Sequence, residues 1–292
     1  MIRKIGIITA LATLLSVNTQ ACDIDGKTGF LPENDMYIGT SAKMMANDMT
    51  KKRFNEIIDA VDDHYKPIVK SRGGRLKWSR KWKNGTVNAS AQRTFRTYRV
   101  NMYGGLARHK LVTEDAFAMV VCHELGHHLA GAPKIGGGSK WASNEGQSDY
   151  FASLKCFRRV FESDDNAAIV AKMEIPAIVV TKCETNFTDS NDQALCQRIS
   201  MGGKSLANLL GSLRNGRTAL SFETPDMTES TKTIDSHPKA QCRLDTYFQG
   251  SLCDKRVSDE LSNTNAKAGT CNRDEGYTEG VRPLCWYAPK SI

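Results

Sequence analysis

The segment that follows Thr113 constrains the fold most, because it has the features of a helix that must be buried. Thr113 is a favourable N-cap residue, and Glu114 in the next position suits the positive end of the helix dipole. Residues 116–122 are apolar nearly all round, which predicts that this helix lies in the protein core. Gly131 and Pro133 mark its end.

The same helix carries the sequence His-Glu-Leu-Gly-His at residues 123–127. Histidines four residues apart lie on one helical face, so His123 and His127 are spaced to bind one zinc ion. Glu124 projects to the side, where a carboxylate can accept a proton from a zinc-bound water. A polar surface patch is the alternative, but a helix that is otherwise buried carries such groups only when they are satisfied. His128 points about 100° away from His127 and is expected to be structural or exposed.

A third zinc ligand is expected from the segment that follows. One large class of zinc peptidases continues with a glycine and a third histidine, but Ala130 and Pro133 hold those positions here. Glu145 follows and stands four residues before Asp149, so both lie on one face of a second helix. This pattern predicts Glu145 as the third ligand and Asp149 as a hydrogen-bond partner of a ligand histidine. A glutamate favoured only by the helix dipole is the alternative.

The rest of the chain has the pattern of short elements around the zinc helix. Residues 22–40 show no period and are expected to form a loop. Apolar spacing and stop signals predict further helices over residues 42–66 (ended by Pro67), from Ser143 to about 161, about 166–175 (ended by Pro176) and about 203–214. Alternating runs predict strands over residues 75–82, 86–92 and 94–102, with a hairpin-type turn at Asn84-Gly85. The expected fold class is α+β, mainly helical, with a small antiparallel sheet before the zinc helix.

The first 21 residues have the pattern of a secretory signal peptide, with Arg3 and Lys4 before an apolar run over residues 5–17. This run is too short for the ~20 residues that span a bilayer, and nothing downstream has the pattern of a transmembrane helix. A lipid anchor on Cys22 is an alternative, although Thr19 stands where lipoprotein signals favour leucine. We therefore expect an exported protein, either periplasmic or secreted.

All nine cysteines follow the predicted signal peptide, so export would allow disulfides to form. No Cys-x-x-Cys pair is present, which disfavours a cysteine zinc cluster. Because nine is odd, one cysteine stays unpaired, and Cys122 in the apolar helix is the best candidate. Spacing alone does not determine the pairing. The plausible sequence-near pairs are Cys183–Cys196, Cys242–Cys253 and Cys271–Cys285, with Cys22 left for Cys156.

The zinc motif and the sequence Asn-Glu-x-x-Ser-Asp at residues 144–149 together resemble the gluzincin metallopeptidases. Within them the chain is similar to the HtpX and CAAX prenyl protease family, in a soluble, exported form. Asn88-Ala89 followed by residues 100–107 resembles the strand pair before the zinc helix of that family. His237-Pro238 followed by Arg243 resembles its late motif. The resemblance covers roughly residues 42–250, but the best-known members have transmembrane helices and lack such cysteines.

The resemblance implies a zinc-dependent endopeptidase with one catalytic Zn²⁺ ion and Glu124 as the base. His237 would donate a hydrogen bond to the oxyanion of the transition state, and Arg243 would organise the site. The strand that contains Asn88 and Ala89 would bind a peptide or protein substrate as an added β-strand.

The implied domain organisation is a signal peptide (1–21), a zincin-like catalytic domain (22–250) and a disulfide-rich C-terminal tail (251–292). One alternative is a zinc hydrolase that acts on cell-wall peptides or another non-protein substrate, for which the basic residues 66–83 would suit an anionic polymer. A noncatalytic binding protein on the same fold is a second alternative, but it predicts a damaged motif. The formal charge of +8 is basic without being extreme, and the signal peptide argues against a nucleic acid partner.

Overall fold

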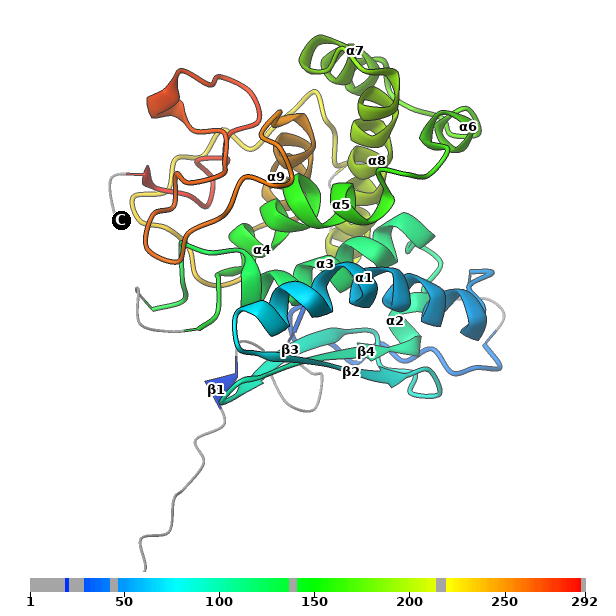
Figure 1. Ribbon diagram of the computed structural model, residues 1–292. Helices are drawn as coiled ribbons and strands as arrows, with labels where there is room; N and C mark the ends of the chain where they lie inside the picture. Colours follow the sequence, from blue (N-terminus) through cyan, green and yellow to red (C-terminus); the bar gives the residue numbers. More distant parts are fainter. Residues whose placement is uncertain (1–18, 21–28, 43–46, 137–140, 214–218, 290–292) are drawn as a thin grey trace, which may run out of the picture.

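The computed structural model describes residues 19–20, 29–42, 47–136, 141–213 and 219–289. Figure 1 shows a small sheet along one side of the molecule, with helices stacked over one of its faces. The fold is mixed α+β and mainly helical, as the sequence predicts. Within the described residues, no helix is both long and apolar enough to cross a lipid bilayer.

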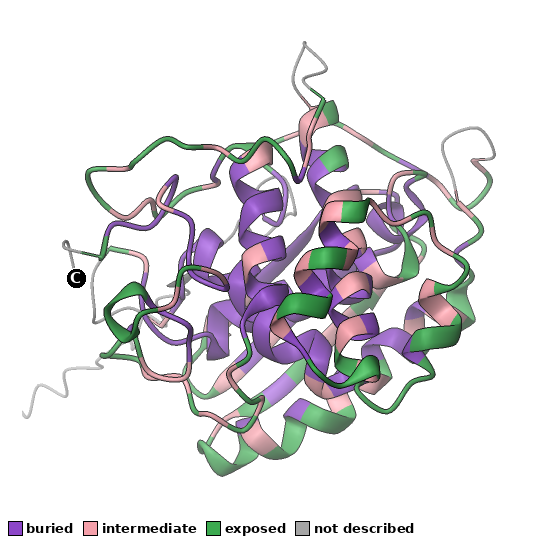
Figure 2. Ribbon diagram, turned by 90° about the horizontal axis from the view of Figure 1, so that it is seen from above, coloured by how far each residue is buried: buried purple, intermediate pink, exposed green. Residues whose placement is uncertain are grey.

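The central element is helix α3 (Glu114–Leu129), which is the buried helix that the sequence predicts. The Thr113 side chain accepts a hydrogen bond from the amide of Ala116 and caps its N-terminus. All residues from 116 to 129 are buried, which places the predicted zinc motif in the core. Figure 2 shows that buried residues gather at the centre of the molecule and exposed ones at its periphery. Helix α3 packs against α1 (Lys51–Ser71), α4 (Glu145–Phe151), α8 (Ser190–Ser212), β3 (Ala89–Thr94) and β4 (Thr97–Tyr103).

The sheet has the strand order β1-β3-β4-β2, where β1 is Thr19–Gln20 and β2 is Arg75–Lys81. The three predicted strands exist, but the sheet is antiparallel only in part: β3 pairs antiparallel with β1 and β4, whereas β2 pairs parallel with β4. The turn at Asn84-Gly85 is likewise not a hairpin between β2 and β3. The chain here crosses over instead, and the Gly85 carbonyl accepts a hydrogen bond from the amide of Ile38.

The helix predicted over residues 42–66 differs from α1 at both ends. Residues 43–46 lie outside the described part, and α1 begins at Lys51. Pro67 does not end it, and the helix continues to Ser71. Tyr65 and Val69 are buried against the core and hold the last turns in place. Pro67 itself faces solvent, where water can satisfy the carbonyl that loses its amide partner.

Two later helices also differ from the prediction. The segment predicted as one helix over about 166–175 contains only α6 (Asn166–Val170), and α7 (Ala177–Asn186) starts directly after Pro176. Helix α8 begins near residue 190 rather than 203, because the Asp189 carboxylate caps its N-terminus. The remaining short helices are α2 (Gly104–Arg108) and a 3-10 turn at Arg273–Glu275.

The helix predicted from Ser143 to about 161 is present as a continuous run. The Asn144 side chain caps α4 by accepting from the amide of Gln147 at 3.0 Å. The chain then passes through a π-helical turn, Ala152–Cys156, into α5 (Phe157–Phe161). This run packs along α3 and brings the second half of the zinc motif next to the first.

Four disulfides join the described cysteines: Cys122–Cys156, Cys183–Cys196, Cys242–Cys285 and Cys253–Cys271. The pair Cys183–Cys196 confirms the prediction. The expectation that Cys122 is unpaired is wrong, because the π-helical turn brings Cys156 next to α3. The pairs Cys242–Cys253 and Cys271–Cys285 are also wrong, since the C-terminal segment folds back onto α9 (Ala240–Leu252). Cys22, like residues 1–18 of the predicted signal peptide, lies outside the described residues.

The C-terminal segment packs against the helices that carry the zinc motif. The division drawn at residue 250 falls inside α9. Trp286 is fully buried and lies against Gly146 of α4, where any added Cβ would meet the indole ring at 2.3 Å. The buried Arg282 guanidinium donates to the side chain of Gln147 on the same helix. The C-terminal segment therefore supports the first turn of α4 directly.

We expect the Cys122–Cys156 disulfide to stabilise the pairing of α3 with the helical run that follows Glu145. Replacing both cysteines by alanine should lower the free energy of unfolding by about 2–5 kcal/mol, because the unfolded chain gains entropy. Urea unfolding followed by circular dichroism measures this loss. A double replacement of Cys253 and Cys271, which lie outside this helix pair, should also lower the free energy of unfolding and serves as a comparison. An unchanged free energy of unfolding in the Cys122/Cys156 double variant would contradict the stabilising role of that bond.

Candidate metal centre

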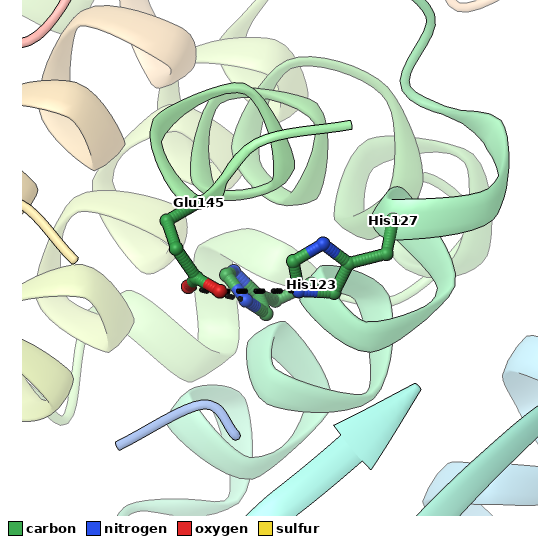
Figure 3. Close-up of side chains that lie close together, drawn as sticks. All are labelled: His123, His127 and Glu145. Atoms are coloured by element: carbon green, nitrogen blue, oxygen red, sulfur yellow. Dashed lines mark ion pairs between the residues drawn. The ribbon is translucent and has the colours of Figure 1, made fainter. Parts of the chain in front are cut away.

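Three side chains from two helices converge in the core (Figure 3). One ligand atom from each of His123, His127 and Glu145 lies within 4.8 Å of the other two. The Nε2 atom of His123 is 3.3 Å from Oε2 of Glu145, and that of His127 is 3.5 Å from Oε1. All three residues are buried. The arrangement matches the three ligands that the sequence predicts.

The hydrogen bonds of the two imidazoles leave one nitrogen of each directed at Glu145. The Nδ1 atom of His127 is 2.8 Å from the Ser143 carbonyl oxygen, which can only accept, so Nδ1 carries the proton and Nε2 is a lone-pair donor. The Nδ1 atom of His123 is 2.7 Å from Oδ1 of Asp149. Among the described residues, Nε2 of His123 and Oε2 of Glu145 have no hydrogen-bond partner although both are buried. These atoms fit a divalent cation that prefers nitrogen and oxygen ligands.

Two other groups of side chains lie close enough together to bind a metal ion. They are Asp226 with Cys242 and Cys285, and Asp254 with Cys253 and Cys271. Their cysteines are joined in disulfides, so no thiolate is free to bind a metal. The His123, His127 and Glu145 group is therefore the metal centre that the chemistry supports among the described residues.

A glycine inside the motif lets the two ligand helices approach closely. A Cβ atom at Gly126 would lie 3.1 Å from the Cα atom of Ser148 and 3.0 Å from the ring of Phe151. A side chain at this position would require its neighbours on α4 to shift by a few tenths of an ångström, so the glycine permits the close approach of the two helices.

Asp149 is fully buried and is the centre of a polar network behind His123. It accepts hydrogen bonds from Nε and Nη2 of Arg243, at 2.6 and 2.7 Å, and from the hydroxyl of Tyr247. Burial raises the pKa of Asp149, but the charges of Arg243 and His123 outweigh it and hold the pKa below its usual range. The carboxylate therefore stays ionised and fixes the orientation of the His123 ring.

The pKa values of the two histidines move in opposite directions. Burial lowers the pKa of His123, but the neighbouring Asp149 carboxylate outweighs burial and raises it to about 9. Burial dominates at His127 and lowers its pKa to about 4. Burial also raises the pKa of Glu145, but the charges of His237 and His127 outweigh it and keep the pKa well below its usual range.

Glu124 lies in the core beside the ligands. Both of its carboxylate oxygens are buried without a hydrogen-bond partner among the described residues. Burial raises its pKa to about 8, with opposing contributions from the charges of His123 and Glu145. A carboxyl group in this environment holds a proton more readily than an exposed one does, which suits a group that accepts and returns a proton.

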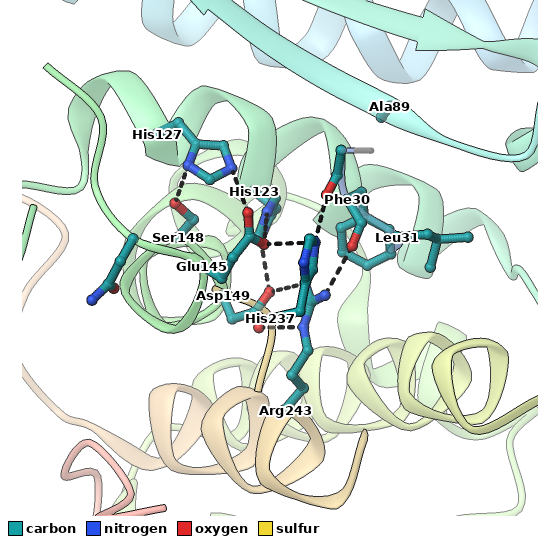
Figure 4. Close-up of polar contacts among 12 residues, drawn as sticks. Phe30, Leu31, Ala89, His123, His127, Glu145, Ser148, Asp149, His237 and Arg243 are labelled. Carbon is teal, nitrogen blue, oxygen red and sulfur yellow. Dashed lines mark hydrogen bonds and ion pairs between the residues drawn. The ribbon is translucent and has the colours of Figure 1, made fainter. Parts of the chain in front are cut away.

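The residues that the family resemblance implies also lie around this site, namely His237, Arg243, Asn88 and Ala89 (Figure 4). Nε2 of His237 lies 3.6 Å from Oε2 of Glu145. Arg243 donates to Asp149, which in turn bonds Nδ1 of His123. Ala89 is the first residue of β3, and its carbonyl accepts a hydrogen bond from the Phe30 amide. Asn88 precedes it and bonds the backbone of Leu31 through its side chain.

Several residues at the site were not expected from the sequence. Tyr247 stands four residues after Arg243 on α9, and this helical spacing could have identified it. Phe30, whose ring packs edge-on against His123 at 5.1 Å, carries no such signal because it lies in a segment without periodicity. His128 stacks between Tyr98 and Trp141 and is buried, which fits the structural role among its two expected possibilities.

No family model, no curated protein and no solved structure matches this chain. The functional argument therefore depends on the residues of the site and their geometry.

Replacing Asp149 by asparagine should lower zinc affinity about 10- to 100-fold, because the His123 ring loses the carboxylate that orients it. Competition with a chromophoric chelator measures the affinity. The matched control is Asp245→Asn, which changes a buried carboxylate that bonds Gln241 and the Asp226 amide. Equal zinc affinity in the two variants would show that Asp149 does not support the metal centre.

Proposed function

We propose that the protein is an exported zinc-dependent endopeptidase of the gluzincin type, similar to the HtpX and CAAX prenyl protease family. The observation that carries the proposal is the buried convergence of His123, His127 and Glu145, with Glu124 adjacent to the first ligand in the motif. Three protein ligands, two of them histidines on one helix, are typical of catalytic zinc sites rather than structural ones.

The residues of the site divide the chemistry between them. When bound, Zn²⁺ would act as a Lewis acid that polarises a carbonyl and lowers the pKa of water towards 7. Glu124 takes a proton from the attacking water and passes it to the leaving amine. His237 would donate a hydrogen bond to the developing oxyanion. Asp149 and Arg243 hold His123 in place and take no part in proton transfer.

The β3 edge beside the site supports a peptide as the substrate. The Ala89 carbonyl points outward from the start of β3 and accepts a hydrogen bond from the backbone of another segment. A substrate added as a strand would use the same main-chain groups, which read the backbone and largely ignore side chains.

Export is part of the proposal. Four disulfides fit a protein that folds in an oxidising compartment. The predicted signal peptide supports the same conclusion, and either the periplasm or the extracellular space would supply the peptide or protein substrates.

A second candidate function is a zinc hydrolase that acts on anionic cell-wall peptides. One observation favours it, namely a basic cavity of about 370 Å³ lined by Arg72, Arg93 and Lys134. The cavity is not lined by the three proposed ligands, but it is lined by His128, which follows His127 in the chain. Lys134 is buried, and its ammonium group donates to the Trp141 carbonyl and the Ser143 hydroxyl. Comparing hydrolysis of casein with hydrolysis of purified cell-wall peptides separates the two candidates.

Replacing Glu124 by glutamine should leave zinc bound but lower the turnover of peptides by at least about 10²–10⁴-fold, because no group remains to move the proton. Metal analysis and a peptide-library assay measure both quantities. The control is Glu114→Gln, which removes an exposed carboxylate from the first turn of the same helix. Wild-type turnover in the Glu124 variant would refute its role as the base.

Removing the metal should abolish hydrolysis and lower the melting temperature. A ligand present at 1,000 times its dissociation constant stabilises the folded state by about 4 kcal/mol. Calorimetry before and after dialysis against a chelator measures the change, and added Zn²⁺ should restore it. In Glu145→Ala, zinc content should fall and the added ion should have little effect. Full zinc occupancy in that variant would show that Glu145 is not a ligand.

A further inference from the structure

The chain places its own residues 29–31 against the proposed catalytic centre. This segment follows the predicted signal peptide by only a few residues and lies between the start of β3 and the metal centre (Figure 4). Both Phe30 and Leu31 have 0% exposure. A loop segment buried this completely is held by specific contacts rather than resting on the surface.

This segment lies at the start of β3, where it forms one main-chain hydrogen bond with Ala89 and two with the Asn88 side chain. The Phe30 amide donates to the Ala89 carbonyl at 3.0 Å. The Leu31 amide donates to Oδ1 of Asn88 at 2.9 Å, and the Asn88 side-chain amide donates to the Leu31 carbonyl at 3.2 Å. Of these groups, the Ala89 carbonyl is the main-chain group that the proposed function assigns to a peptide substrate. At the other end of the edge, β1 pairs with residues 92 and 93.

The segment also occupies the groups beside the metal ligands. The Gly29 carbonyl oxygen is 2.6 Å from Nε2 of His237, which is the proposed donor to the oxyanion. Arg243 donates to the Phe30 carbonyl at 2.9 Å. The Phe30 ring lies against His123, and its centroid is 4.5 Å from the guanidinium carbon of Arg243.

We infer that residues 29–31 are an intramolecular substrate mimic that keeps the peptidase latent until the segment leaves the β3 edge. This inference rests on the proposed function. Since the Ala89 carbonyl and His237 are already bonded, a substrate strand can pair here only after this segment is displaced. The site that Phe30 fills also identifies the substrate class, because an extended peptide with an aromatic or other apolar residue opposite Ala89 would make the same contacts.

Gly29 offers a way to displace the segment without altering any residue of the proposed machinery. A Cβ atom at Gly29 would lie 1.9 Å from the Ala89 carbonyl oxygen and 3.0 Å from Oδ1 of Asn88. Alanine at this position therefore cannot be accommodated while the segment pairs with β3. Gly39 is the matched control, because a Cβ atom there meets only the Tyr37 ring, at 3.9 Å.

The experiment compares the full-length wild-type protein with Gly29→Ala and Gly39→Ala. If the segment blocks the site, Gly29→Ala should hydrolyse a peptide library at least about tenfold faster, because a larger fraction of molecules is competent to bind. Zinc should be extracted faster by 1,10-phenanthroline, and an added protease should cut near residue 29. The Gly39→Ala variant should behave like wild type in all three measurements.

Phe30→Ala provides a second variant. It removes the ring contacts with His123 and Arg243 but keeps the backbone hydrogen bonds of residue 30. A synthetic peptide with the sequence of residues 29–34, GFLPEN, should restore slow hydrolysis to Gly29→Ala, and a scrambled peptide should not. Wild-type hydrolysis and zinc extraction in both variants would overturn the inference. Loss of cooperative folding in both would also overturn it, because the segment would then be a structural part of the core.

The same measurements separate this inference from the proposed function. If no variant hydrolyses any peptide, but zinc extraction accelerates and the GFLPEN peptide reverses the acceleration, the segment covers the metal centre and the peptidase proposal fails. If every variant hydrolyses peptides at the wild-type rate, the peptidase proposal stands and the latency fails.

Discussion

The buried ion pair between Asp149 and Arg243 is the interaction on which the rest of the site depends. Both side chains are fully buried, and neither charge would be tolerated there alone. The pair links α4 to α9. Oδ1 of Asp149, which accepts from Arg243, also bonds Nδ1 of His123 and so orients that ring on α3. Arg243 extends the same network to the Phe30 carbonyl. One ion pair thus fixes the relative positions of three helices and the N-terminal segment.

Besides these polar contacts, a glycine and a disulfide hold together the two helices that carry the proposed ligands. Gly126 allows α4 to lie directly on α3. The Cys122–Cys156 disulfide joins α3 to the end of the π-helical turn that follows α4. The cysteine sits next to the first ligand in the chain, so the disulfide limits how far the two helices can separate. Charged and apolar contacts therefore stabilise the same geometry from different sides, which is typical of a preorganised site.

The parts of the site that follow local rules could be predicted from the sequence. The spacing of His123 and His127, the cap at Asn144 and the four-residue step from Glu145 to Asp149 depend only on helical geometry. The parallel pairing of β2 with β4 could not be predicted, because the connection after β2 bonds a distant segment, at Ile38, instead of forming a hairpin. Cys183–Cys196 could be predicted because its cysteines are near in sequence, but the other three disulfides could not. Cys122, for example, meets Cys156 through helix packing and not through sequence proximity.

The position of Phe30 shows why a segment without periodicity can be the most informative part of a site. Its residues have no helical or strand pattern, since their hydrogen-bond partners lie on other elements, at Ala89, Asn88, His237 and Arg243. Each of these partners has a role in the proposed chemistry. A segment that bonds all of them at once is better explained as a ligand of the site than as a connection. Only residues 22–28 separate it from the predicted signal peptide, so under the proposed export this segment would stay with the mature chain.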